Sequence, residues 1–153
     1  MINESFWKGK RVLITGHTGF KGGWLSIWIK NLGAQVIGYS LNPIPKNNFF
    51  DQTKIKKIFK KDYRKNIQNI NDLEKCINKY KPQIIFHLAA QPGVRFSVSD
   101  PKKYIDENIL AFSKVLEFAR LQKCLCTFFA SSSSVYGDSK KFPINEDMEL
   151  KPK

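Results

Sequence analysis

A glycine-rich turn between an apolar strand and an apolar helix constrains the fold of this chain more than any other feature. Residues 15–22 read Thr-Gly-His-Thr-Gly-Phe-Lys-Gly, directly after the apolar run 12–14 and before the apolar segment 24–29. In a strand–turn–helix unit, glycines let the backbone approach an anion, which meets free N–H groups and the positive end of the helix dipole. The segment therefore predicts a site for a pyrophosphate group.

Helix and strand patterns alternate along the rest of the chain, which is typical of a doubly wound α/β fold with a parallel sheet. In such a fold, ligands bind at the carboxyl ends of the strands. The expected strands lie at 12–15, 35–39, 63–70, 84–88 and 125–130, and the expected helices run to about residue 32, over 72–80, and onward from 100–101.

Two of the expected helices carry apolar patterns that predict how they pack. The first is apolar on nearly every side, so we expect it to be sandwiched within the fold. In the long helix that begins at Asp100, a stripe at helical spacing predicts the core-facing side. That stripe consists of Ile105, Ile109, Phe112 and Leu116.

The chain is strongly basic, with a net charge of +13 over 153 residues. A charge of this size raises the question of a nucleic-acid partner. The excess is almost all lysine, whereas specific readers of DNA depend on bidentate arginine. We interpret the lysines as solvated surface charge and expect no nucleic-acid role.

The sequence shows no apolar run of the roughly 20 residues that a membrane-spanning helix needs. Its first residues lack the features of a secretory signal. The three cysteines are odd in number and have neither zinc-ligand nor Cys-x-x-Cys spacing. We therefore expect a cytoplasmic protein with no membrane partner and no metal site.

Three ordered motifs together point to a family. They are the glycine-rich turn, His-Leu-Ala-Ala-Gln at 87–91, and Ser-Ser-Ser-Ser-Val-Tyr-Gly at 131–137. This combination resembles the extended short-chain dehydrogenase/reductases, that is, the nucleotide-sugar epimerases and 4,6-dehydratases. The N-terminal half is more similar to CDP-glucose 4,6-dehydratase, and the part from Gln91 onward to UDP-glucuronate 4-epimerases.

The resemblance implies roles for single residues and a nicotinamide cofactor, NAD or NADP. Ser132 would be the catalytic serine that hydrogen-bonds the sugar hydroxyl being oxidised. The glycine turn would hold the pyrophosphate, residues 88–91 would line the nicotinamide ribose, and residues 69–70 would meet the adenine. The implied cofactor-binding residues are Gly16, Gly19, Phe20, Lys21, Gly22, Ser40, Asn69, Ile70, Leu88, Ala89, Ala90, Gln91 and Asn108.

This chain departs from the family pattern at the cofactor and at the sugar. Ser40 stands where an acidic residue usually accepts a hydrogen bond from the ribose. The choice between NAD and NADP therefore stays open, with NAD favoured by the resemblance. Asn69 stands where an aspartate commonly accepts from the adenine amino group. Ser133 and Ser134 occupy places where dehydratases often have acidic residues. Because neutral hydroxyls are poor proton shuttles, the serines favour epimerisation over 4,6-dehydration of a substrate such as CDP-glucose.

The resemblance also implies a base, the tyrosine of a Tyr-x-x-x-Lys motif, that would lie beyond Lys153. We therefore expect residues 1–153 to be an incomplete dinucleotide-binding domain, inactive alone, of a longer enzyme. That enzyme would have a C-terminal substrate domain, act on a nucleotide sugar and form a homodimer. The alternative is a catalytically inactive dinucleotide-binding or regulatory module.

Overall fold

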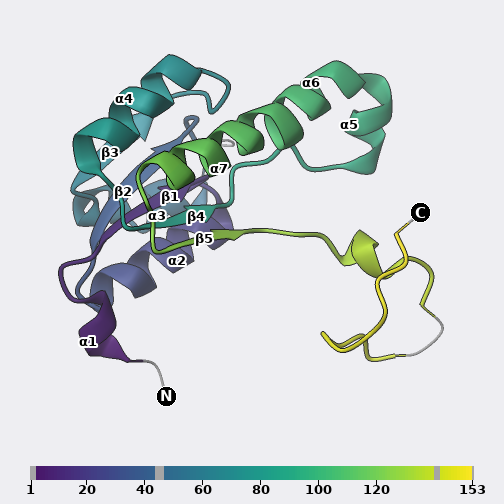
Figure 1. Cartoon of the computed structure of the whole chain (residues 1–153), viewed down its shortest axis with the longest axis horizontal. Helices are drawn as coiled ribbons and strands as arrows, with labels where there is room; N and C mark the ends of the chain where they lie inside the picture. The colour runs from purple at the N-terminus through teal and green to yellow at the C-terminus, as the bar shows by residue number, and fades with distance from the viewer. Residues whose placement is uncertain (1–2, 44–46, 140–141, 153) are drawn as a thin grey trace.

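Five strands form a single parallel sheet in the computed structural model, which describes residues 3–43, 47–139 and 142–152 (Figure 1). Their order across the sheet is β3-β2-β1-β4-β5. The chain first builds outward from β1 and then returns to add β4 on its other side, which creates a topological switch point. The strands are β1 (Arg11–Thr15), β2 (Gln35–Ser40), β3 (Lys61–Arg64), β4 (Ile84–His87) and β5 (Cys126–Phe129).

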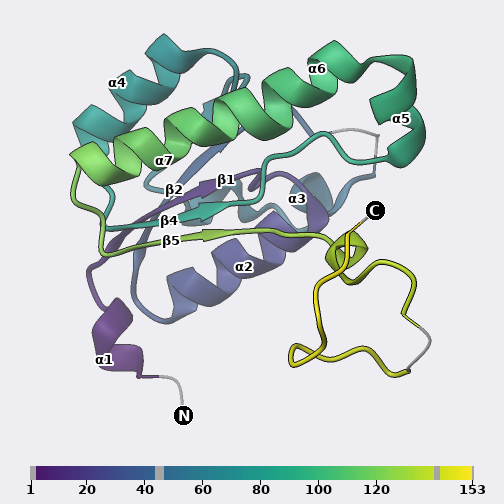
Figure 2. The ribbon, with the colours of Figure 1, turned by 45° about the vertical axis from the view of Figure 1, so that its right-hand side comes forward.

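Helices cover both faces of this sheet. Figures 1 and 2 show α2 (Phe20–Asn31) on one face, with α4 (Ile70–Tyr80) and α7 (Ala111–Leu121) on the other. The α7 helix continues α6 (Pro101–Ile105) through a π-helical segment, Asp106–Leu110. The shorter helices are α1 (Glu4–Trp7), α3 (Phe49–Gln52), α5 (Val94–Ser99) and two 3₁₀ helices, Ile55–Ile58 and Ser133–Tyr136.

The central strand β1 supplies both halves of the core. Its side chains alternate between the two faces of the sheet. Leu13 packs into the cluster with α4 and α7, whereas Val12 and Ile14 pack into the cluster with α2. A strand that is buried on both faces is apolar throughout, which is why its sequence pattern was readable.

The third strand lies earlier than the sequence pattern predicts. It spans Lys61–Arg64 rather than 63–70, and it pairs Ile37 with Lys61 and Ser40 with Arg64. As an edge strand with a partly exposed face, it needs no continuous apolar run, so periodicity did not mark it. The residues that follow β3 therefore begin at Lys65.

The predicted core stripe of the long helix was wrong for three of its four members. Ile105, Ile109 and Leu116 are 46%, 58% and 43% exposed. A π-helical turn is wider than an α-helical one, so it rotates the buried face relative to a regular heptad pattern. The residues of this helix that are buried are Glu107, Ala111, Val115, Phe118 and Ala119.

Helix α2 is not sandwiched, contrary to its all-round apolar pattern. Its buried residues are Gly22, Gly23, Ser26 and Ile29. The aromatic side chains Phe20, Trp24 and Trp28 stay more than half exposed on the outer side. Small residues on the inner side let the helix approach the sheet closely.

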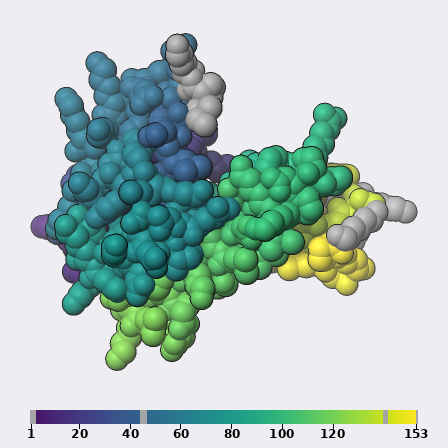
Figure 3. Space-filling model, turned by 90° about the horizontal axis from the view of Figure 1, so that it is seen from above, coloured from purple at the N-terminus to yellow at the C-terminus, as the bar shows by residue number. Residues whose placement is uncertain are grey.

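Beyond β5 the chain leaves the sheet. Figures 1 and 2 show the segment after β5 extending to one side of the sheet and its helices, and in Figure 3 the yellow C-terminal residues lie at one end of the molecule. Strand β5 is thus the edge strand opposite β3, and its Phe128 and Phe129 are about half exposed. No helix within the described ranges has the length and apolarity that crossing a bilayer requires.

Candidate functional site

The glycine turn presents open backbone at the start of α2. The first N–H groups of a helix have no intrahelical acceptor. Gly19, the N-cap of α2, supplies no side-chain acceptor for them either. Gly16 has φ +72°, and a Cβ there would lie 2.8 Å from the carbonyl carbon of Leu88. A Cβ at Gly22 would collide with the Gly16 carbonyl oxygen. Close backbone packing therefore requires glycine at both positions, and the free N–H groups at the start of α2 can bind an anion such as a pyrophosphate.

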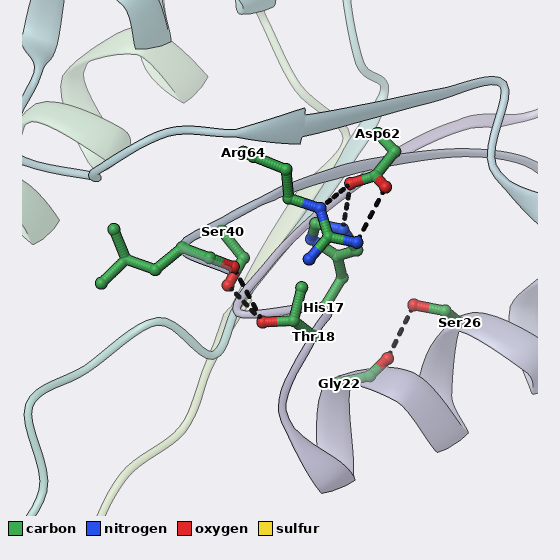
Figure 4. Close-up of polar contacts among 8 residues, drawn as sticks. His17, Thr18, Gly22, Ser26, Ser40, Asp62 and Arg64 are labelled. Atoms are coloured by element: carbon green, nitrogen blue, oxygen red, sulfur yellow. Dashed lines mark hydrogen bonds and ion pairs between the residues drawn. The ribbon is translucent and has the colours of Figure 1, made fainter. Parts of the chain in front are cut away.

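A buried ionic network lies behind this turn. The His17 Nε2 is 2.8 Å from Asp62 Oδ1, and the same carboxylate binds Arg64 through both its Nε, at 2.7 Å, and its Nη2, at 2.9 Å (Figure 4). His17 is completely buried, and a Cβ at Gly38 would lie 2.5 Å from its ring. The network therefore fixes the turn after β1 to strands β2 and β3.

Two groups of this network, His17 and Asp62, have shifted pKa values. Burial lowers the pKa of His17, although the hydrogen bond to Asp62 opposes this shift. Burial alone would raise the pKa of Asp62, but the hydrogen bonds from Arg64 and His17 outweigh it and hold that pKa below its usual value. A neutral imidazole thus donates to an ionised carboxylate, and His17 has a structural role.

Thr18 ties the turn to the end of β2. Its Oγ1 lies 2.8 Å from Ser40 Oγ and donates to the Leu41 carbonyl oxygen at 3.2 Å (Figure 4). Within the helix that follows, Ser26 Oγ donates to the Gly22 carbonyl oxygen at 2.6 Å. These bonds place the Ser40 hydroxyl beside the glycine turn.

The loop after β4 is held from both ends. Thr15 Oγ1 accepts from the backbone N–H groups of Leu88 and Ala89, both at 3.2 Å. At the far end, Asn108 Oδ1 accepts from the Gln91 N–H at 2.8 Å, and Asn108 Nδ2 donates to the Gln91 carbonyl oxygen at 2.9 Å. Asn108 therefore positions this loop through two backbone bonds.

His87 is a neutral side chain at the end of β4. Its Nδ1 lies 2.9 Å from Thr15 Oγ1, and its ring stacks on Phe112. Burial lowers the pKa of His87 to about 4. Since Thr15 Oγ1 already accepts two N–H bonds, its single proton points to the imidazole, which accepts.

Two cavities lie at the carboxyl ends of the strands, and the smaller one is lined by Gly16, Thr18 and Gly19 of the glycine turn. The larger, about 510 Å³, runs along the loop after β4 to the serines after β5. The smaller, about 220 Å³, lies at the ends of β1, β2 and β3. Leu88, Ala89 and Ala90 line both of them. Two cavities that share part of their lining correspond to the two nucleosides of a dinucleotide, which a pyrophosphate joins.

The larger cavity contains the predicted catalytic serine. Ser132 lines it together with Ser131 and Ser134, and Ser132 is exposed. The Ser132 Oγ accepts from the Ser134 N–H at 3.1 Å and donates to Ser134 Oγ at 3.0 Å. Within the described ranges, no Asp or Glu lines this cavity, and no group of three or more His, Cys, Asp or Glu is placed to hold a metal ion.

The predicted residues are not all brought together. Gly16, Gly19, Ser40 and residues 88–90 line the smaller cavity, and Gln91, Asn108 and Ser132 line the larger one. Phe20, Lys21 and Gly22 form the first turn of α2. Asn69 and Ile70 line neither cavity; Asn69 instead caps α4 by accepting from the Asp72 N–H at 3.2 Å.

Sequence reasoning missed several residues that line the smaller cavity, among them Lys65, Asn66, Ile67 and Glu107. Because β3 ends at Arg64, the residues at the mouth of the sheet are Lys65, Asn66 and Ile67, not residues 69–70. The end of an edge strand carries no periodic signal, so its position needed the register with β2. Glu107 was also missed, because a glutamate within a helix reads as surface charge.

A comparison with protein families decides the relationship of this chain. The family model described as GDP-mannose 4,6 dehydratase matches residues 13–153. The chain belongs to this family. Its membership confirms the resemblance to nucleotide-sugar epimerases and dehydratases that the three motifs indicate.

Known members of the family divide between the two reactions. CDP-glucose 4,6-dehydratase of Salmonella typhimurium is 41% identical over 120 residues, which cover 76% of this chain and 32% of that enzyme. A probable UDP-glucuronate 4-epimerase of Rhizobium meliloti is 31% identical and covers 89% of this chain and 41% of the relative. The chain therefore spans less than half the length of these relatives.

A solved relative confirms the doubly wound fold. The crystal structure of UDP-glucose 4-epimerase from Brucella ovis in complex with NAD superposes with a TM-score of 0.75 at 26% identity. The match covers 94% of this chain and 42% of that enzyme.

Proposed function

We propose that this chain binds a nicotinamide dinucleotide, with its pyrophosphate on the glycine turn, its adenosine in the smaller cavity and its nicotinamide in the larger one. The observation that carries the proposal is the pair of cavities that share residues 88–90, the smaller of which is also lined by Gly16, Thr18 and Gly19 of the glycine turn. The 2′-hydroxyl side of such a cofactor lies at the end of β2 in this type of fold. The UDP-glucose 4-epimerase that was solved in complex with NAD supports the assignment.

The proposed activity is oxidation at C4 of a nucleotide-linked hexose, followed by epimerisation. When bound, the cofactor supplies the hydride acceptor for this step. Ser132 would hydrogen-bond the sugar hydroxyl from within the larger cavity, and Asn108 would hold the loop at Gln91 in place. UDP- and CDP-linked sugars are the class of substrate that the names of the relatives support.

Epimerisation is favoured over dehydration by the lining of the larger cavity. Elimination of water needs a general acid and a base beside the sugar. The described lining has serines but no carboxylate, and burial keeps His87 neutral with a pKa of about 4. The 4,6-dehydration of a nucleotide hexose is the second candidate, because the relative that is 41% identical is CDP-glucose 4,6-dehydratase.

We further propose that the chain is the cofactor-binding part of a longer homodimeric cytoplasmic enzyme, with the Tyr-x-x-x-Lys base and the substrate domain in the rest of the protein. Contiguous apolar surface usually marks an interface. Exposed apolar side chains occur on both faces of the edge strand β5, at Phe128 and Phe129, and one turn apart on the long helix, at Ile105 and Ile109. The first would be covered by later strands and the second by a partner subunit.

Product analysis of the full-length protein tests the proposed reaction. The protein is incubated with UDP-glucuronate and, separately, with CDP-glucose, and the sugars are identified by NMR. We expect a C4 epimer from a nucleotide sugar and no loss of water. A 4-keto-6-deoxy sugar as the main product would instead show that the protein is a dehydratase. Cofactor binding without any product would support the alternative of a catalytically inactive module.

A further inference from the structure

Glu107 is a buried carboxylate with little to bind it. It is 8% exposed and lines the smaller cavity. The bond it accepts from Gln68 Nε2 is 3.5 Å long, at the outer limit for a hydrogen bond. Among the ion pairs of the described residues none involves Glu107, and the nearby Lys65 pairs with Asp72 instead. A carboxylate that is buried away from water needs hydrogen-bond donors, because a carboxylate oxygen without a donor costs free energy.

The π-helical segment explains why a charged residue points inward here. Neighbouring residues of a regular α-helix diverge by about 100°. Within the π-helical segment Asp106–Leu110, the consecutive residues Glu107 and Asn108 each line a cavity at the carboxyl ends of the strands. Asn108 binds the Gln91 backbone at the larger cavity, and Glu107 lines the smaller one. Such π-helical turns occur frequently at functional sites.

The position of Glu107 within the smaller cavity favours contact with a base rather than with a ribose. Ser40 lies at the end of β2, where the ribose of the adenosine half is expected. Glu107 contacts Gln68, beyond the end of β3, in the same wall as Asn66 and Ile67. Since Ser40 and Glu107 line the same cavity, a base attached to a ribose near Ser40 would lie in the cavity that Glu107 lines.

We propose that Glu107 determines the choice of base: its carboxylate accepts a hydrogen bond from the exocyclic 6-amino group of adenine. The 6-amino group of adenine is a hydrogen-bond donor, which the carboxylate can accept. The 6-oxo group of hypoxanthine is itself an acceptor, so it cannot bind the carboxylate in this way. The cavity therefore selects adenine over hypoxanthine. This assignment rests on the proposed dinucleotide site and adds a single residue that reads the base.

The test compares NAD with nicotinamide hypoxanthine dinucleotide, which differs at that 6-position. Dissociation constants are measured by calorimetry for the unaltered chain, for Glu107→Gln, and for Glu74→Gln, which removes an exposed carboxylate from α4. We expect about tenfold or stronger preference for NAD in the unaltered chain and in the Glu74 variant, as for a hydrogen bond to a charged group. Glutamine can accept or donate, so Glu107→Gln should reduce the preference to about threefold or less.

Three results would overturn the assignment. Equal affinity of the unaltered chain for both dinucleotides would show that Glu107 does not read the base. Weaker NAD binding by Glu107→Gln, together with stronger NADP binding, would place the carboxylate at the ribose. If neither dinucleotide binds, the proposed cofactor site fails and this inference fails with it, an outcome that is distinct from equal binding.

Discussion

A side chain at position 19 would occupy the place proposed for the pyrophosphate. Gly19 is exposed, and a Cβ there would meet only the Gly16 carbonyl oxygen, at 3.3 Å. The chain should therefore tolerate Gly19→Val in its fold while losing the anion site. We expect NAD affinity to fall by about a hundredfold, the loss of two or more charge-assisted bonds.

Calorimetric titration with NAD measures this loss, and thermal unfolding provides the control. A Gly19→Val variant that unfolds near the temperature of the unaltered chain but no longer binds supports the turn as the anion site. Retained affinity in a folded variant would move the pyrophosphate elsewhere.

At the level of single residues, the sequence was informative where the backbone itself makes the site. Gly16, Gly19 and the loop 88–91 are fixed by strand ends that an apolar pattern marks clearly. The adenine end was harder: Asn69 was assigned from the resemblance to the family, and the expected end of the third strand at residue 70 was too late. Asn69 caps α4, whereas Lys65 to Ile67 line the cavity.

The elements that were predicted well are those buried on both sides. Strands β1, β2 and β4 are apolar because both faces are covered, so their runs are visible in the sequence. The edge strand β3 reads Lys-Asp-Tyr-Arg, and its place depends on pairing with β2. The π-helical turn in the long helix is likewise a tertiary feature that helical periodicity does not reveal.

The packing of β1 and β4 predicts how stability depends on pH. Burial lowers the pKa of His87 to about 4 and also lowers that of His17. The folded chain thus binds fewer protons than the unfolded one, whose histidines titrate near 6.5. The stability from His87 is full above about pH 6.5 and falls by about 3 kcal/mol as the pH decreases towards 4.

Urea unfolding between about pH 7 and pH 4 measures this loss, and His87→Asn is the matched variant, because its amide can still accept from Thr15. The variant should lose less stability over this interval than the unaltered chain. The depressed pKa of Asp62 adds a further loss, at lower pH, in both proteins. Identical pH slopes for the two proteins would show that His87 is not responsible.

At the scale of the whole molecule, the sheet and its helices leave apolar side chains exposed on several surfaces. The outer aromatic residues of α2, the edge strand β5 and the exposed stripe of the long helix face outward. The residues that would bind the dinucleotide nevertheless lie within the described part of the chain. Under the proposal, the 153 residues bind the cofactor, and turnover would need the Tyr-x-x-x-Lys base and the substrate domain proposed for a longer enzyme.

The most direct test is a titration of the isotope-labelled 153-residue chain with NAD, followed through the backbone amide signals in ¹H–¹⁵N NMR spectra. Binding across the glycine turn predicts saturable shifts at residues 19–22, at 40–41 and 66–67 beside the smaller cavity, and at 88–91, of which 88–90 line both cavities. Without the proposed base, no turnover should accompany binding. Unchanged signals at residues 19–22, or shifts confined to other surfaces, would contradict a dinucleotide site at this turn.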